Sequence, residues 1–182
     1  MLLSLPNWPT LLHKFLAERM NTPFVWGKHD CCLFACDAVL AMTGEDLAGD
    51  FRGKYDSALS AVRTMQAFTA ENAESAEKIT RLLDLSRQAV DYPITKSGDL
   101  VGLVADRIAQ NHGIKEIPPL MAQRGDVALV LAARGESLGI VSLRGDSVLS
   151  PGEKGLIALP LKMALKVWRI PKATSVIPNS NG

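Results

Sequence analysis

Residues 24–37 read FVWGKHDCCLFACD, and this stretch decides the fold of the 182-residue chain. It holds all three cysteines, and Asp30 is placed to cap a helix that we expect to begin at Cys31 and to end near Met42, at a Thr-Gly stop signal. A thiol in the first turn of a helix lies beside free backbone N–H groups and the positive end of the helix dipole, which favour the thiolate. Cys31 is therefore a candidate nucleophile.

The pattern changes along the chain from helices to strands. Apolar residues recur at helical spacing in residues 8–20, 57–68 and 100–111. After a Pro-Pro pair, five short apolar runs are separated by Gly, Pro or charged turns, at residues 126–132, 137–142, 146–149, 155–159 and 164–170. This order predicts an α+β fold, with N-terminal helices packed on a C-terminal antiparallel β-meander or partial barrel.

The domain organisation follows from length and local composition. A chain of this size, 47% hydrophobic, supports one well-buried core. We expect a single domain over residues 1–171, interrupted at about 69–98 by an Ala/Glu-rich helical insertion on the surface. Residues 172–182 are rich in Ser, Asn and Pro and are expected to form a flexible tail.

Charge and hydropathy argue against two classes of partner. The chain has 20 basic and 19 acidic residues and no basic cluster interleaved with aromatics, so no nucleic-acid surface is expected. Its apolar runs are far shorter than the roughly 20 residues that cross a bilayer, so no membrane span is expected. The start of the chain lacks the features of a signal peptide, which favours a cytoplasmic location. Three crowded cysteines form no disulfide framework, and reduced thiols are expected.

Several short motifs occur in the order found in one peptidase family. They are Trp26-Gly27, then Asp30-Cys31 opening a helix, then Arg124-Gly125-Asp126-Val127 opening the first strand. This order resembles the NlpC-type cell-wall peptidases, a papain-like family. More narrowly, the chain resembles a branch found in tailed bacteriophages and prophages, on the pieces Trp26 to Cys31, Thr43 to Asp46, Arg52 to Tyr55 and Trp168-Arg169.

The resemblance implies a role for three residues. Cys31 aligns with the family's nucleophile, and Asp30 aligns with the acid that precedes it. The family's strand His-Val-Gly-Ile corresponds here to residues 137–140, Ser-Leu-Gly-Ile, so Ser137 stands at the position of the catalytic base. A thiolate–imidazole pair normally activates the nucleophile and protonates the leaving amine, and serine does neither well.

Two other histidines are candidate substitutes for the missing base. His29 precedes the candidate nucleophile by two residues, and His112 lies at the end of a predicted helix. The simpler interpretation of both is capping or loop hydrogen bonding.

A metal site is an alternative interpretation of the cysteine cluster. His29, Cys31, Cys32 and Cys36 are all soft ligands, but adjacent cysteines on a helix point about 100° apart and no second Cys/His pair follows downstream. Packing of small buried cysteines is the more common arrangement. We therefore expect neither a metal nor another cofactor.

Two hypotheses of function remain. In the preferred one, implied by the resemblance, the protein is a structural component of a bacteriophage tail tip with a degenerate peptidase fold. Its partners are then other tail proteins (hub, distal tail and tape measure), and it passes from the host cytoplasm into the virion tail. In the alternative, it is an active cysteine endopeptidase that acts on peptidoglycan during DNA delivery.

Overall fold

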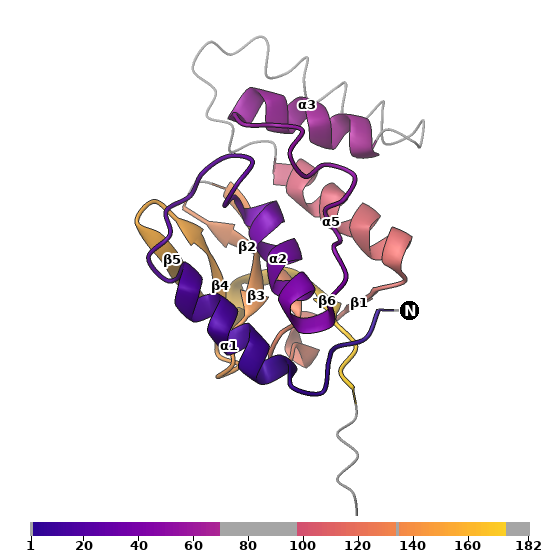
Figure 1. Cartoon of the computed structure of the whole chain (residues 1–182), viewed down its shortest axis with the longest axis vertical. Coiled ribbons are helices and arrows are strands. Elements are labelled where there is room, and N and C mark those ends of the chain that lie inside the picture. Colours follow the sequence, from indigo (N-terminus) through magenta and orange to yellow (C-terminus); the bar gives the residue numbers. More distant parts are fainter. Residues whose placement is uncertain (1, 70–97, 134, 174–182) are drawn as a thin grey trace, which may run out of the picture.

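The computed structural model describes residues 2–69, 98–133 and 135–173. Within these ranges the chain forms four α-helices followed by a six-stranded antiparallel sheet, which confirms the α+β prediction (Figure 1). The helices are α1 (Trp8–Arg19), α2 (Cys31–Thr43), α3 (Ala58–Thr69) and α5 (Gly98–His112). The strands are β1 (Lys115–Ile117), β2 (Val127–Ala132), β3 (Gly135–Val141), β4 (Ser147–Gly152), β5 (Gly155–Pro160) and β6 (Ala164–Arg169). Two short 3-10 helices, η2 (Pro119–Met121) and η3 (Leu161–Met163), precede β2 and β6.

Helix α2 is the central element of the helical layer. The Asp30 side chain accepts a hydrogen bond from the Leu33 amide at its start, and Gly44 ends it in the left-handed conformation at φ 81°. Nine of its 13 residues are buried, because α1 packs on one side of it and β3 and β4 on the other (Figure 1). A helix that is apolar on nearly every side is stable only in such an enclosed position.

The strand order corrects the prediction of a simple meander. The order is β1-β6-β2-β3-β4-β5, so the meander covers β2 to β5, while β6 returns to pair with β2. In a flat sheet, the four strand spacings from β5 to β6 would measure about 19 Å. The four Cα steps from Pro160 to Ala164 reach at most about 15 Å. The sheet must therefore curl, as the expected partial barrel does.

Curling gives the sheet two apolar faces. Leu129 and Leu138 join the large core beneath the helices, together with Leu33, Phe34 and Val39 of α2. The opposite, concave face encloses a smaller cluster: Ala128, Val130, Val141, Val148 and Val167. Consecutive residues of β2 thus alternate between the two cores, as a pleated strand buried on both faces requires.

The predicted helices agree with the structure, whereas one strand was not predicted. The helices expected at 8–20, 57–68 and 100–111 correspond to α1, α3 and α5 within two residues at each end. Strand β1 was not predicted, because its three residues, Lys-Glu-Ile, carry charge and little apolar signal. The predicted insertion falls almost wholly on residues 70–97, outside the described residues.

The C-terminal boundary also differs from the expectation. Lys172 and Ala173, assigned to a flexible tail, are bonded to the body of the domain through Asp126 and Ser4 respectively. The rest of the expected tail lies outside the described residues. Among the helices that the structure describes, none has both the length and the apolar character needed to cross a bilayer.

Candidate functional site

Cys31 is the first residue of α2 and lies at the junction of the helical layer with the sheet. Its residue is partly exposed, whereas Cys32 and Cys36 are buried. Asp30 is extended at φ −92° and ψ 172°, so the chain turns directly into the helix and leaves the thiol at the N-terminal end. This is the position that the sequence predicted for a nucleophile.

Asp30 anchors the turn that presents this thiol. Only 2% of the residue is exposed, yet its carboxylate accepts hydrogen bonds from the amides of Gly27 at 2.9 Å and Leu33 at 3.0 Å, and from the Tyr55 hydroxyl at 2.8 Å. Burial raises the pKa of Asp30, and these hydrogen bonds oppose the rise. Both carboxylate oxygens are occupied, so Asp30 holds the site in shape and is not free to act on a substrate.

Gly27 explains why the loop and Tyr55 lie so close. Its φ is +71°, and a Cβ at this position would overlap the carbonyl oxygen of Tyr55. Only glycine permits both the backbone conformation and the close approach. The Trp-Gly motif and the Arg-Gly-x-Tyr motif, separate in the sequence, therefore form one structural unit around Asp30.

Ser137 faces Cys31 from strand β3. The Ser137 side chain and the Leu138 backbone amide both help to lower the pKa of Cys31, which places them beside its sulfur. The position at which the resemblance puts a histidine is thus next to the thiol, and serine occupies it. Ser137 also lies 2.8 Å from the hydroxyl oxygen of Ser150 on β4, and Ser150 donates to the Leu138 carbonyl at 2.8 Å.

Ser150 is the site residue that sequence reasoning missed. It is fully buried, in a strand whose other residues are buried or partly buried. The available signal was a hydroxyl on the inward face of an apolar strand, which needs an internal hydrogen-bond partner.

The three thiols differ in acidity. A hydrogen bond from the Cys32 thiol lowers the pKa of Cys31, with the bonds from Leu138 and Ser137 acting in the same direction against burial. The same contact raises the pKa of Cys32, which becomes the hydrogen-bond donor of the pair. Burial raises the pKa of Cys36. Cys31 is therefore the thiol that ionises first.

His29 contacts a backbone carbonyl and an aromatic ring. Its Nδ1 lies 3.1 Å from the Pro23 carbonyl oxygen, and its ring packs edge-on against Phe34. Only 4% of the residue is exposed, and within the described residues its Nε2 has no hydrogen-bond partner. Burial lowers the pKa of His29. The neutral ring is a packing element at this position.

The remaining candidates do not converge on Cys31. His112 ends α5 and is partly buried, and in the part of the chain that the structure describes neither it nor His29 hydrogen-bonds to the thiol. In the same ranges, no group of three or more His, Cys, Asp and Glu side chains could hold a metal ion. The alternative ligand set of His29 and the three cysteines thus has no support from the geometry.

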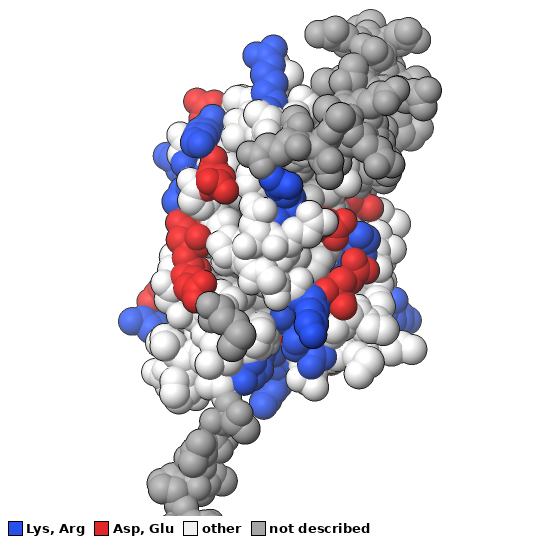
Figure 2. Space-filling view, turned by 90° about the vertical axis from the view of Figure 1, so that its right-hand side faces the viewer, with Lys and Arg blue, Asp and Glu red and all other residues white. Residues whose placement is uncertain are grey.

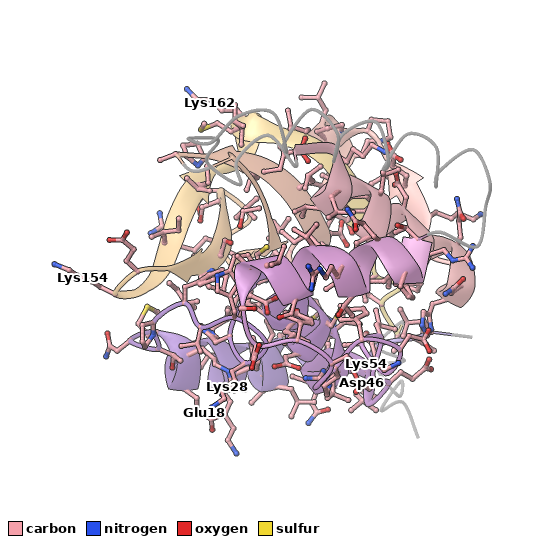
Figure 3. All side chains as sticks on the ribbon, turned by 90° about the horizontal axis from the view of Figure 1, so that it is seen from above. Glu18, Lys28, Asp46, Lys54, Lys154 and Lys162 are labelled. Atoms are coloured by element: carbon pink, nitrogen blue, oxygen red, sulfur yellow. The ribbon has the colours of Figure 1, made fainter. Side chains whose placement is uncertain are left out.

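Asp37, the second acidic residue of the stretch 24–37, is paired with an arginine. Asp37 accepts a 2.7 Å hydrogen bond from Arg52, which also binds Asp46 through two nitrogens at 2.9 Å. Asp46 lies in the loop between α2 and α3 (labelled in Figure 3). Arg52 therefore joins Asp37 on α2 to Asp46, so the Thr-Gly-x-Asp and Arg-Gly-x-Tyr motifs tie the loop to α2.

Comparisons with known proteins give one positive finding. Neither the curated proteins nor the solved structures yield a match to this chain. The model of a domain of unknown function, DUF6950, matches residues 4–107 and 94–170 and so includes Cys31, Ser137 and Ser150. Because these matches together cover well over half of the chain, the protein belongs to the DUF6950 family.

Proposed function

We propose that the protein is a structural component of a bacteriophage tail tip, built on a papain-like, NlpC-type domain that has lost peptidase chemistry. The observation that carries this proposal is the pair of hydrogen-bonded serine hydroxyls beside Cys31. Ser137 lies beside the thiol and helps to lower its pKa, its hydroxyl oxygen lies 2.8 Å from that of Ser150, and Ser150 donates to the Leu138 carbonyl oxygen. The side chains of this network are hydroxyls, and neither is a titratable base.

The chemistry of peptide hydrolysis explains why this matters. A cysteine peptidase needs a group that takes the thiol proton and later gives a proton to the leaving amine. A serine hydroxyl does not gain or lose a proton near neutral pH, and a backbone carbonyl cannot accept one. Loss of general acid–base help alone lowers rates by roughly a hundred- to ten-thousand-fold. Serine hydroxyls that hydrogen-bond to each other and to the backbone are typical of a packed interior, not of a catalytic centre.

The scaffold around the thiol supports a structural role in a second way. Asp30, Gly27 and Tyr55 lock the turn before α2 through contacts that are buried and mutually satisfied. The residues that resemble the phage branch are those that hold the loops in place, including Arg52 and Asp46. A domain held rigid by such contacts can pack against neighbouring tail proteins (hub, distal tail and tape measure) without catalysing a reaction.

One observation favours the alternative, an active cysteine endopeptidase on peptidoglycan. Hydrogen bonds lower the pKa of Cys31 at the N-terminus of a helix, as a nucleophile requires. A hydrolytic cycle would still need a base, and His29 is engaged with Pro23 and Phe34 instead. We therefore place this function second.

The test separates assembly from catalysis in the phage or prophage that encodes the protein. Its gene is deleted and complemented with the wild type or with Cys31→Ala, and purified particles are examined for the protein and for infectivity. We expect the protein in the tail fraction, loss of intact tails on deletion, and equal rescue by both versions. Absence of the protein from particles would overturn the proposal. Rescue by the wild type alone would favour the peptidase.

A further inference from the structure

The two edges of the sheet differ in chemistry. Strand β1 forms one edge with three residues, of which Lys115 and Glu116 are charged and exposed. On the side of the molecule where β1 lies, Figure 2 shows basic and acidic side chains next to one another. Strand β5 forms the other edge with six residues, Gly-Leu-Ile-Ala-Leu-Pro, none of which is charged. Proteins commonly protect a sheet edge by keeping it short or charged, and β1 has both features whereas β5 has neither.

The middle of β5 is open to solvent. Ile157 and Ala158 lie on opposite faces of the sheet, yet both are exposed, Ile157 by 39%. The loop after α1 covers only the first end of the strand, where the Leu156 amide donates to the Met20 carbonyl at 2.9 Å. At the other end, η3 begins directly after Pro160. The uncovered part of the edge therefore lies between these two ends.

The register of β5 on β4 shows which backbone groups of this edge are unpaired. Successive residues of an antiparallel strand direct their N–H and C=O groups to alternate sides. The Leu156 amide bonds to Met20 and not to β4, so Ala158, two residues further on, also directs its N–H and C=O groups away from β4. Among the described residues, no backbone group hydrogen-bonds to the Leu156 carbonyl or to either group of Ala158. The edge therefore presents one donor and two acceptors in a row.

Backbone groups at this spacing match an extended polypeptide. An antiparallel strand would donate to the carbonyls of Leu156 and Ala158 and accept from the Ala158 amide. A second copy of β5 is a poorer match. Centred on Ala158, the copy would place its Pro160 opposite Leu156, and proline has no N–H to donate. The same register would bring Lys154 of each copy toward Lys162 of the other.

Two lysines flank this edge. Lys154 lies in the turn before β5 and Lys162 lies in η3 after it, and both are exposed and point away from the body of the molecule (Figure 3). None of the ion pairs within the described ranges involves either lysine. A strand with acidic residues at both ends would complement these two charges, whereas a second copy would oppose them.

We infer that β5 binds an extended segment of another protein by strand addition, and that this segment is uncharged in its middle and acidic at both ends. Backbone pairing with Leu156 and Ala158 provides the contact, and the two lysines favour the acidic ends. The inference depends only on this edge and is independent of the tail-protein proposal.

The experiment titrates the full chain with acetyl-Glu-Glu-Val-Thr-Val-Thr-Val-Glu-Glu-amide by calorimetry at low salt. The same peptide with N-methyl groups on its five central residues lacks the required N–H donors and is the comparison probe. Ala158→Pro removes the outward donor without breaking a bond to β4, and Ala158→Thr keeps that donor. A double variant, Lys154→Gln with Lys162→Gln, removes the flanking charges, and Lys14→Gln removes an exposed charge on α1. Thermal melting checks that each variant is folded.

Binding is expected to weaken at least tenfold in Ala158→Pro and with the N-methylated peptide, but less than threefold in Ala158→Thr. The lysine double variant should bind about two- to fivefold more weakly, and Lys14→Gln should bind like the wild type. Hydrogen exchange of the Ala158 amide, followed by NMR, should be fast in the free protein and at least tenfold slower with the peptide bound.

Four results would each overturn the inference. The first two are no binding up to about 5 mM peptide and equal binding of the N-methylated peptide. The third is an Ala158 amide that is already protected in the free monomer, because the edge would then be covered. The fourth is a dimer that Ala158→Pro dissociates, because the edge would then belong to a second copy. Unchanged affinity in the lysine double variant would overturn the acidic ends of the segment.

Discussion

The hydrogen bond from Tyr55 to Asp30 gives a quantitative test of how the candidate site is held. The bond measures 2.8 Å, and both residues are almost wholly buried, so water cannot replace a lost partner. A hydrogen bond to a charged group contributes about 1.5–3 kcal/mol to stability. Tyr55→Phe should therefore lower the free energy of unfolding by about that amount, measured by urea denaturation followed by circular dichroism.

A double-mutant cycle isolates the pair itself. Tyr55→Phe and Asp30→Asn are measured singly and together, and we expect a coupling energy of at least about 1 kcal/mol. Thr64→Ala is the control, because its hydroxyl donates to the Lys54 carbonyl at 3.3 Å in an exposed position beside the same loop. It should change stability by no more than about 0.5 kcal/mol. Additive effects in the cycle would refute the view that this bond anchors the turn.

Three further outcomes are expected. Gly27→Ala should prevent folding or lower the free energy of unfolding by more than about 3 kcal/mol, because φ is positive there and the new Cβ would overlap the Tyr55 carbonyl oxygen. Gly44→Ala, also at positive φ but with open space around it, should lower that free energy by only about 1 kcal/mol. Equal melting temperatures for the two variants would contradict this prediction. The pKa of His29 is lower in the folded protein than in the unfolded chain, so the unfolded chain binds the proton first as the pH falls. Stability should therefore decrease as the pH drops below 6.5. Thermal melts at several pH values should show a weaker pH dependence for His29→Asn than for the wild type. Cys31 should react with iodoacetamide faster than the other two cysteines, as peptide mapping would show, and preferential labelling of either buried thiol would count against the assigned acidities.

The helical half of the fold was predictable because its signals are local. Asp30 and Gly44 are a capping residue and a stop residue, and both perform those roles in α2. The position of Cys31 at the helix start followed from them. Helix periodicity likewise placed α1, α3 and α5 to within two residues.

The sheet and the full site were less predictable because they depend on contacts distant in sequence. The return of β6 to β2 is set by the curl of the sheet and by the Asp126–Arg169 ion pair at 2.9 Å, neither of which leaves a local pattern. Ser150 on β4 likewise hydrogen-bonds to Ser137 on the neighbouring strand β3, a contact that no local pattern indicates. The partnership of Asp30 with Tyr55 spans 25 positions, and the sequence alone did not decide the role of Tyr55.

The most direct test of the central claim is the release of soluble peptides from purified peptidoglycan. The wild-type protein and Cys31→Ala are compared at matched concentration, after circular dichroism has shown that both are folded. The account predicts no release above the buffer control by either protein, because the hydroxyl chain from Ser137 to Ser150 offers no base to the thiol. Release by the wild type that disappears in Cys31→Ala would contradict it and establish a working cysteine peptidase.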